Sequence, residues 1–348
     1  MQIEKNAAGA VRVAQHQIRY LSSKNFEVHV FADRIDKESV IACGGIPHKA
    51  LLWKGTGHLR RVIFAWQAQR LAKKLRADLV IGHGDLQQQD VLFLHNTVHL
   101  AHELIHGAPL SSKHEMYRTH TPQLKDQRFK LLVANSQMMK RDLIKRFNIP
   151  ENKITVAYPA INNQRFTVGT PEDRLRTRGE LGISADTFLV GLVTSGNFKK
   201  RGLDLYLEAI KLLPATTRAK AKFVLAGKDA PPETDLITHL PIRSDVENYY
   251  RALDLFVLPA RIEEFGLVVP EAAACGCDIL ISDTVGSGEL FSAKNIKIHP
   301  LNAEILSRMM NEKILLTNPK DKNLIVDANL ASEAQTEKVY DDIFKAYL

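Results

Sequence analysis

The chain has 348 residues, of which 45% are hydrophobic and 25% charged, a balance typical of globular proteins. This length is too great for one ordinary core and favours two domains of about 150 to 170 residues. No run of about 18 apolar residues is present, so no membrane span is predicted. Three cysteines in no zinc or redox spacing favour a reduced cytoplasm.

The formal net charge is +8 and the sequence pI is near 9.2. A basic balance suits nucleic acid, an anionic membrane or phosphorylated substrates. No nucleic-acid motif and no basic array interleaved with aromatic residues accompanies it, so no nucleic-acid partner is expected. We interpret the charge as attraction to an acidic lipid surface or to nucleotide phosphates, and a generic solvated surface remains the alternative.

The first half begins with apolar residues at helical spacing and then alternates like a strand over 25–33. Segment 43–58 is glycine-rich but lacks the GxxxxGK[ST] pattern of a phosphate-binding loop. The other expected elements are a helix over 59–76, strands over 78–82, 91–95 and 130–135, a helix over 137–147 with Ser136 as its N-cap, and an exit strand over 152–161 that closes the first domain.

The second half follows a charged crossing segment over 163–186. Its expected elements are strands over 187–194, 222–228, 252–259 and 277–283, with helices over 199–213, 241–253, 270–275 and 332–348. Ser332 with Gln335 fits a capping box for the last helix, which carries an apolar stripe. Strands that alternate with helices predict parallel sheets.

Two carboxylates eight residues apart, Glu263 and Glu271, flank a short loop and a helix start. The backbone N–H groups of Phe265, Gly266 and Leu267, together with the helix N-terminus, predict a site for an anion. Glu271 offers a carboxylate to a sugar hydroxyl. The alternative is a solvated acidic turn before an ordinary helix.

A second polar segment, SGNFKKRG, follows the predicted strand 187–194. It contains Gly196, Asn197, Lys200 and Arg201, and cations beside a helix N-terminus can neutralise a diphosphate. A solvated basic turn is the alternative. No Asp-x-Asp sequence is present to hold a divalent ion, so these cations, with no metal or other cofactor, are expected to balance the charge of a bound diphosphate.

A rival signal is the HExxH sequence over 102–106. On a helix its two histidines could bind zinc with Glu103 as the general base, and His95 and His99 would continue the same stripe. Gly107 and Pro109 end any helix at once, and no third ligand follows at a known spacing. A zinc hydrolase is therefore only an alternative.

The pattern E-x-F-G-L-x-x-x-E-A-x-A-C-G over 263–276 resembles the signature of the family-4 retaining glycosyltransferases. The phrase Ala134-Asn135-Ser136 with Tyr158-Pro159 and Phe166 also matches that family. The resemblance implies a GT-B fold of two facing Rossmann-like domains with parallel sheets. It implies an N-terminal acceptor-side domain over 1–165, a nucleotide-sugar domain over 166–330, and a helix over 331–348 that crosses back to the first domain.

The same resemblance implies roles for individual residues. Glu263 and the backbone of 265–267 would hold the transferred sugar, and Glu271 the ribose. Lys200 and Arg201, in the loop with Gly196 and Asn197, would hold the diphosphate. His95, after strand 91–95, would sit by the reacting carbon, with His99 as the second candidate and Gly9 on the acceptor side.

The implied function is transfer of a hexose, with retention, from a UDP- or GDP-sugar to a glycan or glycolipid. The pattern is similar to that of bacterial enzymes of lipopolysaccharide core synthesis, which predicts a cytoplasmic enzyme at the anionic inner-membrane face. The first strand of the family is expected to be missing here, through a late start codon or in a shortened member. A non-catalytic protein that binds sugar nucleotides therefore stays open.

Overall fold

The computed structural model describes residues 2–3, 9–52, 57–194, 196–231, 233–241, 243–291, 296–316 and 332–347. The chain forms two compact units. Unit 1 contains residues 1–159 and 336–348, and unit 2 contains residues 160–335. The division lies a few residues before the boundary expected at 165, and each unit is described separately below. None of the described helices combines the length and the apolar character that a bilayer crossing needs.

Unit 2 contains a six-stranded parallel sheet of order β11-β10-β9-β12-β13-β14. Its strands are β9 (Phe188–Thr194), β10 (Ala221–Gly227), β11 (Thr238–Leu240), β12 (Leu255–Leu258), β13 (Asp278–Ser282) and β14 (Ile296–His299). Every residue of β9, β12 and β13 is buried. These continuous apolar runs are what a parallel sheet covered on both faces requires.

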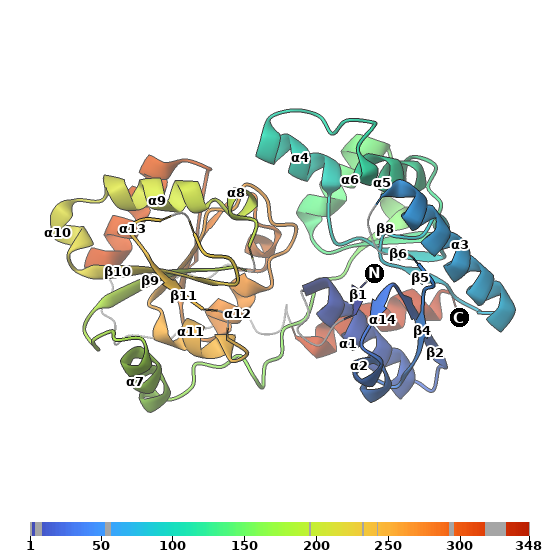
Figure 1. Cartoon of the computed structure of the whole chain (residues 1–348), viewed down its shortest axis with the longest axis horizontal. Coiled ribbons are helices and arrows are strands. Elements are labelled where there is room, and N and C mark those ends of the chain that lie inside the picture. Colours follow the sequence, from blue (N-terminus) through green and yellow to red (C-terminus); the bar gives the residue numbers. More distant parts are fainter. Residues whose placement is uncertain are drawn as a thin grey trace. The chain divides into compact units, whose positions relative to one another are not determined.

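Helices cover both faces of this sheet, as Figure 1 shows. Val190 and Leu192 of β9 pack with α9 (Leu203–Leu212) and α13 (Ala303–Leu316), whereas Leu189 and Val193 pack with the helices of the other face. The alternation follows from the two-residue period of a strand. The other helices of unit 2 are α7 (Pro171–Glu180), α8 (Phe198–Arg201), α10 (Ala215–Arg218), α11 (Val246–Ala252), α12 (Val268–Ala274) and the 3-10 segment η2 (Gly286–Leu290).

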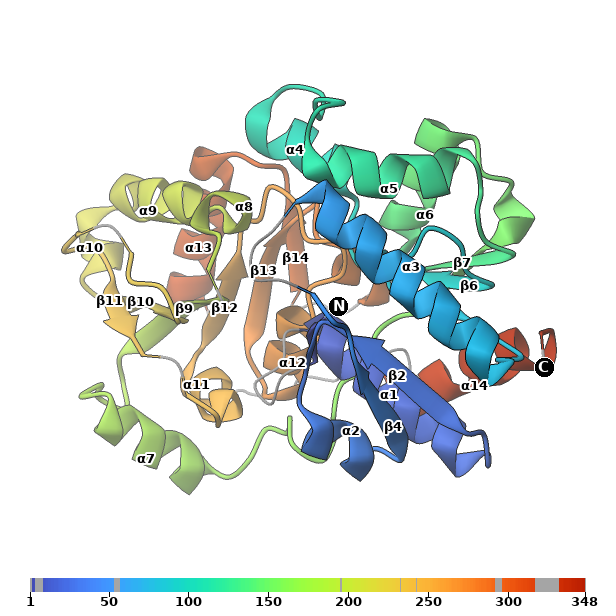
Figure 2. The ribbon, with the colours of Figure 1, turned by 45° about the vertical axis from the view of Figure 1, so that its right-hand side comes forward.

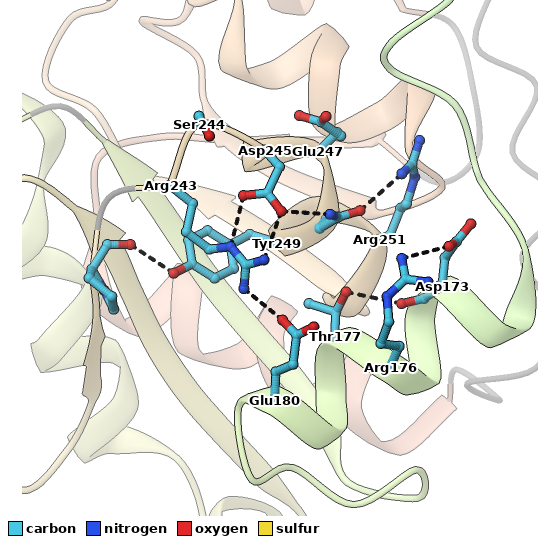
Figure 3. A network of polar contacts seen from close by, with 12 residues as sticks. Asp173, Arg176, Thr177, Glu180, Arg243, Ser244, Asp245, Glu247, Tyr249 and Arg251 are labelled. Carbon is cyan, nitrogen blue, oxygen red and sulfur yellow. Dashed lines mark hydrogen bonds and ion pairs between the residues drawn. The ribbon is translucent and has the colours of Figure 1, made fainter.

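Polar contacts fix α7 to the region of α11. Arg243 donates to Asp245 and to Glu180 of α7, and its guanidinium lies over the ring of Tyr249 (Figure 3). Beneath this surface network, Arg178 is 1% exposed and pairs with Asp254 at 2.5 Å. A buried guanidinium needs such a partner because an uncompensated charge away from water is costly.

Unit 1 contains a four-stranded parallel sheet of order β5-β6-β7-β8 and two separate parallel pairs, β2-β4 and β1-β3. The strands are β1 (Gln2–Ile3), β2 (Val28–Ala32), β3 (Arg34–Ile35), β4 (Gly45–Lys49), β5 (Ile81–Gly82), β6 (Val91–Phe93), β7 (Leu131–Ala134) and β8 (Ile154–Val156). The expectation that the first strand is missing is corrected, because Gln2–Ile3 form a two-residue strand.

The helices of unit 1 are α1 (Gly9–Ser23), α2 (Lys37–Ala42), α3 (His58–Leu75), α4 (Val98–His106), α5 (Glu115–Lys125), α6 (Gln137–Phe147), the 3-10 segment η1 (Glu151–Lys153) and α14 (Glu333–Lys345). Figures 1 and 2 show α14 beside α1. Tyr340 and Phe344 of α14 contact the ring of Tyr20, and the cluster includes buried residues of β6 and β7. The prediction that the last helix packs on the first domain is confirmed, and Ser332 accepts the N–H of Gln335 as expected.

Candidate functional site

The strand order of unit 2 reverses between β9 and β12, which are neighbours in the sheet. From β9 the chain moves to β10 on one side, and β12 lies on the other side. In open parallel sheets, ligands bind outside the carboxyl ends of strands at such a switch point. Two loops leave the sheet here: the described residues 196–197 with α8 follow β9, and 259–267 follows β12. They carry most of the residues predicted to bind a ligand.

The loop after β9 has a strained backbone that glycine and asparagine tolerate. Gly196 and Asn197 have φ angles of 120° and 55°, and the Asn197 side chain accepts the N–H of Lys200 as the N-cap of α8. Gly202 has a φ angle of 71°, and a Cβ atom there would meet the carbonyl oxygen of Pro259 at 1.8 Å. The backbones of the two loops therefore touch at Gly202.

The cations of the first loop pair with carboxylates of the second. Lys200 Nζ lies 2.7 Å from Glu264 Oε2, and the Arg201 guanidinium pairs with the carboxylate of Glu263. Burial lowers the pKa of Arg201 from its ordinary value, and the charge of Glu264 opposes that effect. The backbone N–H of Arg261 donates to the carbonyl of Lys200 at 2.8 Å. The structure thus brings Lys200, Arg201 and Glu263 together, as the sequence predicts.

A third loop, which follows β13, holds the second one in place. Glu263 N–H donates to Thr284 at 3.0 Å, Gly286 N–H donates to Glu263 at 2.9 Å, and Ser287 N–H donates to Phe265 at 2.8 Å. Because these backbone bonds cross between neighbouring strand ends, the position of the Glu263 carboxylate is set by the sheet itself.

Glu271 lies in α12 and is 2% exposed. The helix begins at Val268, two residues before the predicted start at Pro270, whose missing N–H is tolerated because it still falls in the first turn. Gly276 has a φ angle of 87°, so the predicted left-handed stop is confirmed. Within the described residues, the N–H groups of Gly266 and Leu267 make no hydrogen bond, which leaves them available to an anion.

In unit 1, His95 follows β6 and lies against His83, which follows β5. The distance from His83 Nδ1 to His95 Nε2 is 2.8 Å, and the ring planes differ by 4°. Burial lowers the pKa of His83 to about 3 and that of His95 to about 4. The two facing nitrogens, Nδ1 of His83 and Nε2 of His95, can share only one proton between them. Both are therefore neutral imidazoles near pH 7, and His95 lies at the carboxyl edge of its sheet, as predicted.

The two other candidates in unit 1 have different surroundings. His99 is 8% exposed, its Nε2 atom lies 2.9 Å from Thr121 Oγ1, and its ring contacts those of Tyr117 and Phe147. These contacts give His99 a packing role inside unit 1. Gly9 is the first residue of α1.

The HExxH sequence forms α4, which ends at Gly107 with a φ angle of 69°, as predicted. His102 and His106 have ring centroids 4.6 Å apart, but both Glu103 oxygens bind Arg146, at 2.7 and 2.8 Å. His95 lies outside the helix, so the expected continuous stripe is wrong. Among the described residues, no group of three or more histidine, cysteine or acidic side chains is placed to hold a metal.

Sequence reasoning missed three contributors to the site: Glu264, the loop after β13, and His83. Glu264 occupies an unspecified position of the motif, so only its contact with Lys200 reveals its role. The loop after β13 had a signal, since Gly286-Ser287-Gly288 directly follows a predicted strand, as ligand-binding loops do.

Residues 7–165 match the model described as "Glycosyltransferase Family 4", and residues 190–314 match "Glycosyl transferases group 1". A probable transglycosylase of Burkholderia thailandensis is 27% identical over 264 residues, which cover 74% of this chain and 69% of the relative. A D-inositol 3-phosphate glycosyltransferase of Xylanimonas cellulosilytica is 28% identical over 174 residues, or 44% of this chain and 41% of that relative, so the chain spans less than half of its length.

Solved structures match across nearly the whole chain. WaaG, a glycosyltransferase involved in lipopolysaccharide biosynthesis, has a TM-score of 0.75 and 19% identity, covering 98% of this chain and 93% of WaaG. HepE of Anabaena in complex with UDP-glucose has a TM-score of 0.74 and 16% identity, with 96% of each chain covered. At these identities the likeness shows the fold. With a family model on each half, the chain is a family-4 glycosyltransferase with the GT-B fold.

Proposed function

We propose that this glycosyltransferase transfers a hexose from a nucleotide diphosphate sugar to a glycan or glycolipid acceptor, with retention at the anomeric carbon. The observation that carries the proposal is the meeting of Lys200, Arg201 and Glu263 at the switch point of the unit 2 sheet, next to α12 with Glu271. HepE, which has a similar fold, binds UDP and UDP-glucose, so a UDP-sugar is the first donor to test.

In such a transfer the bond between sugar C1 and the phosphate oxygen breaks, and the nucleoside diphosphate leaves with the bonding electrons. The sugar gains oxocarbenium character, and the acceptor hydroxyl adds to C1 after losing its proton. Lys200 and Arg201 would stabilise the growing phosphate charge, which is greater in the transition state than in the bound donor. A phosphate would compete there with Glu263 and Glu264, which pair with the two cations.

Glu271 would accept hydrogen bonds from the ribose hydroxyls, and the free N–H groups of Gly266 and Leu267 would bind sugar or phosphate oxygens. Gly196 and Asn197 would shape the diphosphate loop. In unit 1, His95 would contact the transferred sugar as a neutral imidazole, and Gly9 would lie on the acceptor side. No metal is needed in this scheme because protein cations and N–H dipoles carry the charge balance.

The proposal is tested by calorimetry with UDP-glucose, GDP-mannose, ADP-glucose and a CMP-sugar. We expect one diphosphate sugar to bind and the CMP-sugar, a monophosphate, to fail. Glu271→Gln should weaken that binding about tenfold or more, since a hydrogen bond to a charged group contributes about 1.5–3 kcal/mol. The matched control is Glu304→Gln, an exposed first-turn glutamate of α13 in the same unit. Unchanged binding in Glu271→Gln would reject the ribose role.

The acceptor proposal rests on the net charge of +8 and on the fold shared with WaaG, which acts in lipopolysaccharide biosynthesis. We propose a lipopolysaccharide-core acceptor and peripheral binding to the anionic cytoplasmic face of the inner membrane. Sedimentation with anionic vesicles should decrease as salt rises, because exposed charges are screened over about 10 Å at 0.1 M salt. Equal sedimentation with neutral vesicles would exclude an electrostatic attachment.

A further inference from the structure

The excess positive charge of the chain is concentrated in one segment of unit 1. Residues 39–77 contain eight lysines and arginines and no aspartate or glutamate, so the formal charge of this segment equals the +8 of the whole chain. In the rest of the sequence, acidic and basic residues balance. Helix α3 belongs to this segment and runs along the surface of unit 1 (Figure 2). Electrostatic attraction to an anionic partner would therefore act at α3 and its neighbours.

Two faces of α3 are apolar, and the fold uses only one of them. Phe64 is buried in a hydrophobic cluster of unit 1. Toward solvent, Leu59 is 65% exposed, Val62 38% and Trp66 56%. Their spacing of three and four residues places them in one stripe along the helix. A single exposed leucine is ordinary, but three large apolar side chains aligned on one helix form a surface that packing inside unit 1 does not explain.

A fourth exposed apolar side chain is held beside α3. Gln67 of the helix accepts the N–H of Leu51 at 2.9 Å and donates to the carbonyl of Leu51 at 2.8 Å. These two hydrogen bonds fix the backbone of Leu51, while its side chain remains 84% exposed. The protein therefore presents this leucine to the outside in a defined position.

The exposed stripe becomes basic toward the end of the helix. Arg70 and Lys73 continue its spacing, Lys74 and Arg76 follow, and all four side chains are exposed. Among the described residues, the ion pairs of α3 all lie in its first turn, so none of these four cations belongs to one. The Arg70 guanidinium lies 5.4 Å from the centre of the Trp66 ring, which joins the apolar part of the stripe to the basic part.

We infer that this surface of α3 docks the protein on an anionic lipid bilayer. In helices that lie in a membrane interface, leucine and tryptophan side chains enter the acyl boundary, and lysines and arginines remain among the headgroups. A nucleic acid would use the cations but leave the leucines in water, so a bilayer is the partner that satisfies both parts. The docking face consists of Leu51, Leu59, Val62, Trp66, Arg70, Lys73 and Lys74.

This inference rests on the proposed attachment to an anionic membrane and assigns the part of the molecule that makes it. Tryptophan emission tests it at the docking face. The chain has two tryptophans, so Trp53→Phe in the full chain leaves Trp66 as the only one. With vesicles of equimolar phosphatidylglycerol and phosphatidylcholine, we expect emission at shorter wavelength and less quenching by acrylamide, and no change with phosphatidylcholine alone. Sedimentation with the anionic vesicles without a change in Trp66 emission would overturn the inference.

The basic part is tested by combining Arg70→Gln, Lys73→Gln and Lys74→Gln. Each cation at an anionic surface strengthens binding by about fivefold, so this variant should bind the anionic vesicles about 10- to 100-fold more weakly. The matched control lowers the net charge equally at exposed lysines elsewhere in unit 1, through Lys113→Gln, Lys125→Gln and Lys145→Gln. It should lose less than about threefold. Equal losses in the two variants would show that the overall charge and not α3 binds the membrane.

The apolar part is tested by the double variant Leu51→Ser, Leu59→Ser. Both side chains are exposed, so the fold is retained, and vesicle binding should weaken by about tenfold or more because less apolar surface leaves water. The control is Val168→Ser with Leu175→Ser in unit 2, where the side chains are 43% and 53% exposed. Unchanged vesicle binding in the Leu51 and Leu59 variant would contradict insertion of this face.

Other occupants of the docking face would give different results. A change in Trp66 emission with polyuridylate but not with vesicles would assign the face to nucleic acid. A change that grows with protein concentration in the absence of vesicles, with a dimer in gel filtration, would assign it to a second copy of the chain. Either result would overturn the inference.

Binding of UDP-glucose separates this inference from the proposed donor site. Calorimetry should give the same affinity in all variants of the docking face, because α3 belongs to unit 1 and the donor loops belong to unit 2. Failure of the unaltered protein to bind any diphosphate sugar would count against the donor proposal alone, whereas failure to bind anionic vesicles would count against the docking face.

Discussion

Lys200 of the loop after β9 donates to Glu264 of the loop after β12, with 2.7 Å between Nζ and Oε2. The side chain of Glu264 is 3% exposed and that of Lys200 is 14% exposed, so the pair is largely shielded from water. A lysine held in this way has lost its rotamer freedom before any ligand arrives, and this preorganisation is what electrostatic stabilisation of a leaving group requires.

Replacing Lys200 with alanine should raise the dissociation constant of UDP by about 10- to 100-fold, the equivalent of a charged hydrogen bond of about 1.5–3 kcal/mol. The adjacent Lys199 is exposed, and Lys199→Ala changes the net charge equally. Calorimetry at one salt concentration should show less than about a threefold effect for Lys199→Ala. An equal loss of UDP affinity in both variants would mean that UDP binding depends only on the overall charge of the protein.

The contact between Gly202 and Pro259 predicts a large loss of stability in Gly202→Ala. Its Cβ atom would meet a backbone oxygen at 1.8 Å, in addition to the cost of a φ angle of 71°. Gly182 has a φ angle of 66° and no atom within 4 Å of an added Cβ, so Gly182→Ala measures the cost of the backbone conformation alone.

In urea denaturation we expect Gly182→Ala to cost about 1–2 kcal/mol. Gly202→Ala should cost at least about 2 kcal/mol more, because the two loops must separate. It should also weaken nucleotide binding, whereas Gly182→Ala should not. Similar unfolding free energies for the two variants would contradict the close approach of the loops.

Acidification should destabilise unit 1 through His120. Burial lowers its pKa from 6.5 to about 4, an effect that Asp85 opposes and that Arg61 and His99 increase. The unfolded chain takes up a proton near pH 6.5 and the folded chain only near pH 4, so stability present above pH 6.5 is lost as the pH falls through this window.

Between pH 7.5 and pH 4, the unfolding free energy falls by on the order of 3 kcal/mol because of His120. His120→Asn should therefore reduce the pH dependence of the unfolding free energy, measured in urea at several pH values, by about this amount, while His83 and His95, whose pKa values burial also lowers, keep part of the slope. His106→Asn, at an exposed position of α4, should leave the slope unchanged. A slope in His120→Asn equal to that of the unaltered protein would contradict a contribution from His120.

Transferase activity should persist in EDTA. Glu103 is bound by Arg146 through both oxygens and is not available as a general base beside a zinc ion. The double variant His102→Ala, His106→Ala should retain activity within about twofold, because its two positions lie on the half-exposed face of α4. Loss of activity in EDTA that zinc restores would instead favour a metal role for this helix.

The sequence predicts unit 2 more completely than unit 1, for physical reasons. The strands β9, β12 and β13 are continuous apolar runs, which the hydrophobic pattern identifies directly. By contrast, β4 contains Gly45 and Pro47 and has no strand pattern; it forms because β2 offers a partner, and as an edge strand it tolerates proline.

The candidate site also combines residues that the sequence predicts with contacts that it does not predict. Lys200, Arg201, Glu263 and Glu271 are predicted because each belongs to a motif with fixed spacing. The pairing of Lys200 with Glu264 and of His83 with His95 joins segments 64 and 12 residues apart, and only the fold brings such side chains together. Spacing along the chain carries no information about these contacts.

The return of the chain to unit 1 after residue 335 has a consequence for biosynthesis. Tyr340, Ile343 and Phe344 complete the cluster around Tyr20, yet they are synthesised only after all of unit 2. Unit 2 can therefore fold before unit 1 is complete, and unit 1 keeps part of its apolar surface uncovered until this C-terminal helix has been made. Truncation of the final turns would leave that surface open to chaperones and proteases.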